Sequence, residues 1–159
     1  MYFSAEEVIE LDKIQNKNIS QVIAHYWVNI TDENNPIKVL DTLEINFNDG
    51  EKLGLTGRTD ECIKLCKTDI DKDREEIINQ FHGKIVIQTA DLTQTDDWKN
   101  AQNLAYISLR KDSNGQYLND ALLLCFESKE LVIFYDGDSL AIEEVFEEID
   151  EDSLTEDLD

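Results

Sequence analysis

Basic side chains are scarce in this sequence. The chain of 159 residues has 14 Lys and Arg against 36 Asp and Glu, which gives a formal net charge of −22. A nucleic-acid ligand is not expected, because phosphate binding needs a positive surface that releases counterions. Two explanations of the charge stay open. The surface could serve a basic protein partner, whose complementary field speeds encounter, or it could be the generally acidic surface of an acidic or halotolerant host.

Long apolar runs and cysteines are also few. No window approaches the roughly eighteen apolar residues that mark a membrane-spanning helix, so we expect no membrane association. The opening MYFSAEEVIE carries acid where a secretory signal is basic, and no signal is expected. Cys62, Cys66 and Cys125 are an odd number without a disulfide framework, which suits reduced thiols in a cytoplasmic protein.

Metal-binding patterns are incomplete, and we expect no metal ion and no cofactor. The carboxylates in TDIDKDREE alternate as in a calcium loop, but the positions that need Gly and a bidentate Glu hold Arg74 and Gln80. We interpret this stretch as the start of a helix, where the positive end of the helix dipole favours carboxylates. Cys62 and Cys66 have three residues between them, whereas zinc and redox motifs have two.

Catalytic signatures are equally weak. The six glycines form no phosphate-binding cluster. The two histidines are His25, on an expected strand, and His82, at an expected helix end. A Cys–His nucleophile pair stays open, because its members would meet in space and not in sequence. A pair of catalytic carboxylates needs a desolvated cleft that no sequence displays. We expect a protein without enzymatic activity, and keep a small enzyme as an alternative.

Alternation of apolar and polar residues predicts mostly antiparallel strands. One hairpin, LDTLEINFNDGEKLGL, turns at Asp49-Gly50, and a second, NDALLLCFESKELVI, turns at Ser128-Lys129. A capping box and a glycine stop predict two helices. The expected helices cover 5–14 and 69–81, and the other expected strands cover 19–30, 85–89 and 105–109.

The two hairpins suggest an internal repeat. At an offset of 79, Asp41, Leu43 and Phe47 fall over Asp120, Leu122 and Phe126. The same offset places Tyr26 over Ala105, and an offset of 78 places Cys62 over Leu140. Duplication is one explanation, and chance matching of alternating strands is the other. We predict an α+β fold with two or three short helices. Its antiparallel sheet, or half-barrel, would be built from two similar hairpin units around one core.

The C-terminal end is strongly acidic. Residues 143–159 hold ten acids and no base. We expect a single domain over 1–142, with halves at about 19–65 and 85–142, followed by a tail at 143–159. Residues 143–149 could form an amphipathic helical turn. Two explanations stay open, a solvated tail and an electrostatic arm for a basic partner.

In its length, acidity, few cysteines, α+β layout and Asp-Gly hairpin, the chain resembles small acidic bacterial immunity proteins. This resemblance implies a protein that binds a basic toxin or effector and blocks its active site without chemistry. A phage-type inhibitor that imitates nucleic acid is the alternative. Affinity would come from aromatic anchors in an acidic surround. The expected contact residues are Trp98, Asp96, Asp97, Asp136, Asp138, Glu143, Glu144, Glu147, Glu148, Asp150, Glu151 and Asp152.

Overall fold

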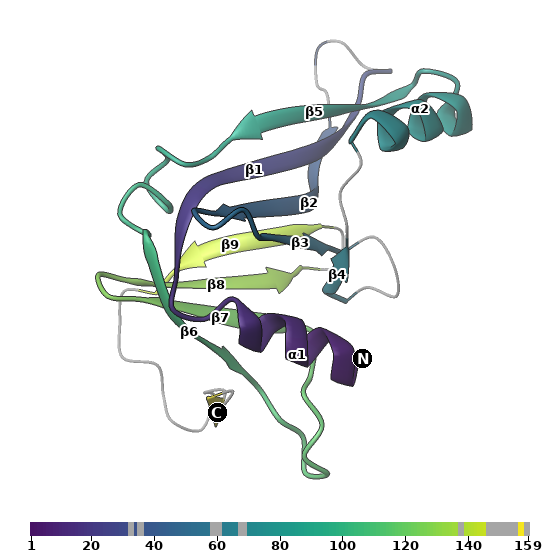
Figure 1. Cartoon of the computed structure of the whole chain (residues 1–159). Helices are drawn as coiled ribbons and strands as arrows, with labels where there is room; N and C mark the ends of the chain where they lie inside the picture. The colour runs from purple at the N-terminus through teal and green to yellow at the C-terminus, as the bar shows by residue number, and fades with distance from the viewer. Residues whose placement is uncertain are drawn as a thin grey trace.

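The structure, a computed structural model, describes residues 1–31, 34, 37–57, 62–66, 70–136, 139–145 and 156–157. These residues contain two helices and ten strands (Figure 1). The helices are α1 (Ala5–Lys13) and α2 (Ile70–Phe81). The strands are β1 (Lys17–Asn29), β2 (Ile37–Phe47), β3 (Lys52–Thr56), β4 (Lys64–Cys66), β5 (Ile85–Asp91), β6 (Asn103–Leu109), β7 (Ala121–Phe126), β8 (Glu130–Tyr135), β9 (Leu140–Glu144) and β10 (Glu156–Asp157).

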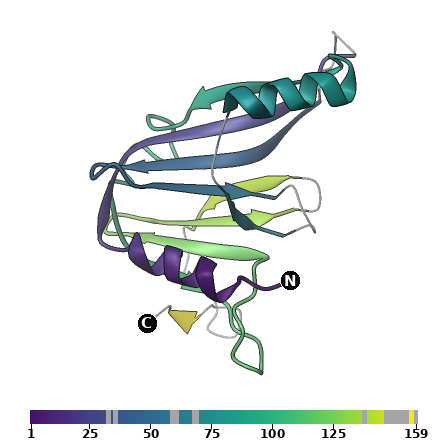
Figure 2. The same cartoon turned by 45° about the vertical axis from the view of Figure 1, so that its right-hand side comes forward.

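One antiparallel sheet dominates the fold. Its strand order is β4-β3-β2-β1-β6-β7-β8-β9, with β5 added beside β1 and β10 beside β6. The sheet is strongly curved and open, and the long strand β1 bends through it from the β5 end toward β6 (Figures 1 and 2). The predicted α+β class and antiparallel sheet are confirmed. No helix in the described ranges is long and apolar enough to cross a membrane.

The sheet consists of two meanders of four strands each, β1 to β4 and β6 to β9, which meet where β1 lies beside β6. The hairpins match in register: Leu43 pairs with Leu55, and the residues 79 and 78 positions later, Leu122 and Ile133, pair with each other. The flanking hydrogen bonds match too. Gly57 N–H donates to Asp41 O at 3.3 Å, and Tyr135 N–H donates to Asp120 O at 3.1 Å. The two similar hairpin units are thus confirmed, while their origin by duplication stays a prediction.

The offset predicted for the first strand of each unit is wrong. In the structure Val22 lies opposite Ile45, and Ile107 lies opposite Leu124. Val22 therefore corresponds to Ile107, at an offset of 85 instead of 79. The error arises because alternating strands match at every second residue, so the pattern alone cannot select one register. Tyr26 and Ala105 are not equivalent.

A smaller correction applies to the last strand of each unit. Leu65 lies opposite Leu55, and Ile142 lies opposite Ile133. The offset there is 77, so Leu140 corresponds to Ile63 and not to Cys62. Both Ile63 and Leu140 are buried, as equivalent core positions should be.

The two units share one hydrophobic core, to which α1 contributes. A meander that stood alone would leave its apolar face in water, and here each unit covers the apolar face of the other. The largest fully buried side chains come from α1, from both units and from the segment before β4: Leu11, Leu43, Ile45, Leu55, Ile63, Leu104, Ile107, Leu109, Leu122, Leu124, Leu131 and Ile133. This single core holds the two units and α1 together, so the loops and edges that they carry keep their places on the surface.

Both predicted helices are confirmed, and they lie at opposite ends of the curved sheet (Figures 1 and 2). The capping box of α1 is present: Glu7 N–H donates to Ser4 Oγ, and Ser4 N–H donates to Glu7 Oε1. Helix α2 ends where Gly83 takes a φ of +79° and its N–H donates to Ile78 O at 3.0 Å. The expected cap at 68–69 lies outside the described residues.

The sheet extends further toward the C-terminus than predicted. Glu143 and Glu144 belong to β9, where they pair with Val132 and Leu131 of β8. They therefore continue a strand and do not start the expected helical turn. The rest of that turn, at 146–149, lies outside the described residues. The expected boundary at residue 142 falls inside β9.

Candidate functional site

The loop between β5 and β6 carries the only tryptophan among the expected contact residues. Thr95 Oγ1 donates to Leu92 O at 2.6 Å, and Trp98 N–H donates to Thr95 O at 3.1 Å, which winds the loop into successive turns. The Trp98 side chain is 3% exposed and packs edge-on against Phe126, with ring centroids 6.4 Å apart. The loop thus inserts Trp98 into the core. The prediction that Trp98 is a surface anchor needs correction.

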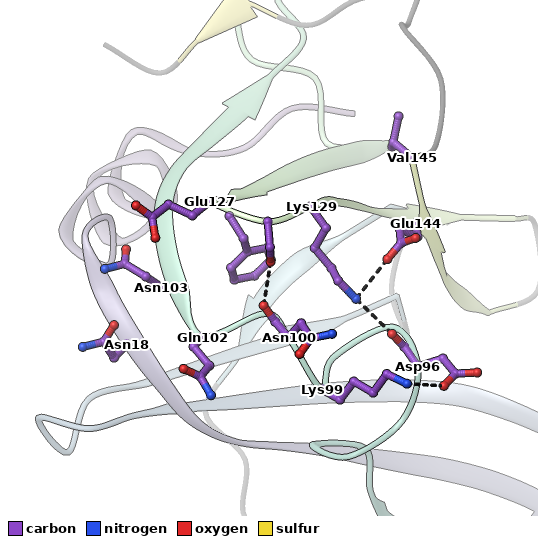
Figure 3. A pocket seen from close by; sticks show the side chains of 12 residues that line it. Asn18, Asp96, Lys99, Asn100, Gln102, Asn103, Glu127, Lys129, Glu144 and Val145 are labelled. Carbon is purple, nitrogen blue, oxygen red and sulfur yellow. Dashed lines mark hydrogen bonds and ion pairs between the residues drawn. The ribbon is translucent and has the colours of Figure 1, made fainter.

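Beside this loop lies a hollow of about 880 Å³, which we call the polar hollow (Figure 3). It opens between the loop, the β7–β8 turn and the end of β9. Most of its lining side chains are amides, carboxylates or ammonium groups: Asn18, Asp96, Lys99, Asn100, Gln102, Asn103, Phe126, Glu127, Ser128, Lys129, Glu144 and Val145.

Lys129 is the central group of the polar hollow. Its ammonium group lies 2.9 Å from Glu144 Oε1 and donates to the backbone oxygens of Asp96 and Asp97, also at 2.9 Å (Figure 3). The Lys129 and Glu144 side chains are only 10% and 19% exposed. A nearly buried ammonium with three oxygen partners is fully satisfied. Lys129 therefore ties the loop to the β7–β8 turn and to β9.

The structure brings some of the expected contact residues together and separates others. Asp96, Asp97 and Glu144 meet around Lys129, and Glu143 is the neighbour of Glu144 on β9. Asp136 lies at the opposite end of the β8–β9 hairpin, where it accepts a hydrogen bond from Ser139 N–H at 3.1 Å. The remaining ones, Asp138, Glu147, Glu148, Asp150, Glu151 and Asp152, lie outside the described residues.

A second hollow, of about 810 Å³, lies between α1 and the β3–β4 edge of the sheet; we call it the α1 groove. Sequence reasoning missed this site. The exposed side chain of Ile9 is its most accessible apolar group. The lining combines apolar and charged residues: Ser4, Glu6, Glu7, Ile9, Glu10, Lys13, Ile14, Lys17, Glu51, Lys52, Leu53, Gly54, Leu65 and Cys66.

Every lysine that lines the two hollows has a carboxylate partner. Around the α1 groove, Lys13 pairs with Glu10 at 3.1 Å, Lys17 with Asp49 at 2.6 Å and Lys52 with Glu44 at 3.7 Å. In the polar hollow, Lys99 pairs with Asp96 at 3.2 Å and Lys129 with Glu144. The hydrogen bond from Lys17, supported by the backbone N–H of Glu51, lowers the pKa of Asp49.

Some carboxylates that line the hollows have no ion-pair partner among the described residues. Within the described part of the chain, Glu6 and Glu51 in the α1 groove and Glu127 in the polar hollow have no cation within 4.0 Å. All three are exposed. The two linings therefore carry the same net charge of −1, from four carboxylates and three lysines in the α1 groove and from three carboxylates and two lysines in the polar hollow.

The histidines lie away from both hollows. His25 is 5% exposed, and its Nδ1 lies 3.0 Å from Thr89 Oγ1, which also accepts from Arg74 at 3.2 Å. Burial lowers the pKa of His25, against the opposing charge of Glu44. His82 is exposed, with a φ of +54° just after α2. In the described ranges neither histidine lines a hollow.

All three cysteines carry reduced thiols. Cys125 is buried in β7, whereas Cys62 and Cys66 are partly exposed, and none of the three is in a disulfide. Among the residues that the structure describes, no group of three or more His, Cys, Asp or Glu is arranged to hold a metal ion.

Comparisons with known proteins give no relative: no family model, curated protein or solved structure matches this chain.

Proposed function

We propose that this chain is a non-catalytic, acidic binding protein that neutralises a basic protein by covering its active site. One observation carries the proposal: within the described part of the chain the lysines of both hollows are already ion-paired, so exposed carboxylates remain there that a cationic partner could match. Unmatched like charges repel one another, and a cationic surface placed against them removes that cost.

The charge is spread over enough exposed side chains to act at long range. The chain carries a net charge of −22, and complementary fields of this kind raise association rates, an effect that salt screens. Exposed carboxylates occur on both helices, in turns and on strands: Glu6, Glu10, Asp12, Asp49, Glu51, Asp71, Glu75, Glu76, Asp91, Asp96, Asp120, Glu127, Asp136 and Glu143. The partner would be a nuclease-like or other basic toxin or effector domain, met in the cytoplasm of a bacterium.

Affinity capture tests this proposal. The tagged full chain is used to capture proteins from the host lysate, and the captured protein is purified and assayed with increasing amounts of this chain. We expect a basic protein, released by salt, whose activity is lost at one molar equivalent. If the captured activity survives saturating amounts of the chain, or if the partner is acidic and insensitive to salt, the proposal is wrong.

Matched charge variants locate the effect. One variant changes Glu147, Glu148 and Asp150 to the corresponding amides, and the other does the same for Asp71, Glu75 and Glu76 of α2. Both lose three charges, so a purely global field predicts equal losses of affinity. A larger loss in the first supports the tail as an electrostatic arm. A captured nucleic-acid-binding protein that DNA displaces would instead support the imitation of nucleic acid.

A further inference from the structure

We infer that the α1 groove is the docking site for the partner, and that it receives a segment with a large apolar side chain flanked by Lys or Arg. The inference rests on the proposed function and adds a place and a chemistry to it. It moves the expected contact from the polar hollow and tail to the opposite edge of the sheet, where β3 and β4 meet α1.

Ile9 is the most exposed apolar side chain in the α1 groove. This side chain is 55% exposed although it lies in a groove whose wall contains buried Ile14 and Leu53 and partly buried Leu65. A single exposed isoleucine needs no explanation, but Ile9 shares its hollow with the partly exposed Leu65, and these two side chains form the apolar patch of the groove. Covering it with an apolar side chain removes that patch from water, which favours binding.

The charges around this patch select a cationic partner. Glu6 and Glu51 line the groove without a cation partner among the described residues, while Lys13, Lys17 and Lys52 are each held by a carboxylate. An apolar centre with a charged rim is the usual anatomy of a protein interface. Lys or Arg on both sides of an apolar anchor would meet this rim.

The walls of the groove are already fixed, which lowers the entropy cost of binding. The capping box holds the first turn of α1, and β4 is paired to β3 through Leu55 and Leu65. Glu7 Oε2 also accepts a hydrogen bond from Leu65 N–H at 2.9 Å, which joins the two walls directly. The groove is therefore a formed surface that needs no folding step on binding.

The polar hollow fits such a segment less well. Among its carboxylates only Glu127 lacks a cation partner within the described residues, whereas the α1 groove has two such exposed carboxylates, Glu6 and Glu51. Its aromatic member, Phe126, is buried against Trp98 and offers little surface. Its wall is mainly charged side chains and amides, which suit ion pairs and hydrogen bonds more than an apolar anchor.

Nuclear magnetic resonance with defined peptides tests the inference. The ¹⁵N-labelled full chain is titrated at low salt with Gly-Lys-Lys-Gly-Leu-Leu-Gly-Lys-Lys-Gly, with the same peptide carrying Ser-Ser for Leu-Leu, and with one carrying Glu for Lys. We expect the leucine peptide to shift the resonances of Ile9, Leu53 and Leu65. The serine peptide should bind about tenfold more weakly, and the glutamate peptide should not bind.

Matched variants separate the groove from the general charge. Ile9→Ser should weaken the leucine peptide about tenfold, whereas Ile78→Ser, at an isoleucine 48% exposed on α2, should leave it within about twofold. The double variant Glu6→Lys/Glu51→Lys should weaken binding more than Glu127→Lys/Glu143→Lys, which has the same net charge. Because the shift map uses the unaltered chain, it tests the site even if a variant fails to fold.

The outcomes distinguish the two proposals. Shifts centred on the polar hollow, or equal losses in the two double variants, overturn the α1 groove and leave the proposed function standing. Equal binding of the leucine and serine peptides overturns the apolar anchor and therefore the inference. If no cationic peptide binds even at low salt, the proposed function fails together with the inference.

Discussion

Glu7 Oε2 accepts a hydrogen bond of 2.9 Å from the backbone N–H of Leu65, and this contact joins helix α1 to the edge strand β4. The other oxygen of the same carboxylate accepts from Ser4 N–H at 3.0 Å. One side chain thus caps a helix and satisfies a strand at the edge of the sheet. Edge strands with unpaired backbone groups invite association with other chains, so this contact also protects the sheet.

The variant Glu7→Ala should destabilise the protein by about 2 kcal/mol, because it removes a helix cap and a charge-assisted hydrogen bond at once. Glu7→Gln should lose about half as much, since the amide retains one acceptor oxygen for the two donors. Urea unfolding followed by circular dichroism measures both. The control is Glu6→Ala, one position earlier in α1, which should stay within about 0.5 kcal/mol. Equal effects at Glu6 and Glu7 would contradict the bridging role.

Lys129→Met should lower the free energy of unfolding by about 2 kcal/mol, because the Glu144 carboxylate and two backbone oxygens lose their shared donor. Lys99→Met should cost less than about 1 kcal/mol, since its ion pair with Asp96 is exposed. The double variant Lys129→Met/Glu144→Gln should recover part of the loss, because it removes the unpaired charge. Urea unfolding of all three variants provides the measurement, and a loss that the second change leaves untouched would contradict this account.

Acidification below pH 6.5 should destabilise the protein through His25. Burial lowers its pKa in the folded state, so between that value and 6.5 the unfolded chain binds more protons. Stability should therefore fall with falling pH, by up to about 1.4 kcal/mol per pH unit for this one group. The charged groups that face His25 are Glu44 and Asp41 of β2 and Asp73 and Arg74 of α2.

Unfolding in urea at several pH values between 5 and 8, which is roughly the range in which histidines titrate, tests this dependence. His25→Gln should flatten the profile, and His82→Gln, at an exposed site, should leave it unchanged. Asp49, Asp91 and Asp112 have lowered pKa values, so their stabilising contribution is lost only below about pH 4 and does not overlap with this window. A profile that His25→Gln does not alter would refute the assignment.

Local signals were sufficient to predict much of the fold. The capping box at Ser4 and Glu7, the turn at Asp49-Gly50 and the helix stop at Gly83 each act within a few residues, and all three occur as expected. Their chemistry is decided by nearby backbone groups, which the sequence displays directly.

Features that depend on distant segments could not be predicted. The registers of β1 and β6 differ from the predicted equivalence by six residues, because alternation fits every second position. Trp98 was expected at the surface because its neighbours in the sequence are polar. Its packing against Phe126 depends on a strand that comes later in the chain. The α1 groove was missed because it forms only when β4 lies beside α1. Strand β4 comes more than fifty residues after Ile9, so the sequence around Ile9 does not show the groove.

The seam between the two units includes a contact of two equivalent residues, Gly57 and Tyr135, which lie 78 positions apart. A Cβ at Gly57 would lie 2.6 Å from Tyr135 Cδ2 and 3.3 Å from Leu140 Cδ2. Gly57→Ala should therefore destabilise the protein by about 2 kcal/mol, because overpacking forces the ring or the strand to move.

A double-mutant cycle tests whether this loss comes from the seam. In the background of Tyr135→Leu the ring is gone, so adding Gly57→Ala should cost clearly less than in the unaltered chain. Gly50→Ala is the control, since nothing lies within 4 Å of its Cβ position and its φ of +89° makes the cost purely conformational. Its cost should be the same with either residue at 135. If Tyr135→Leu changes the cost of Gly57→Ala and the cost of Gly50→Ala by the same amount, the loss at Gly57 does not come from its contact with Tyr135. The two units would then pack together through other residues.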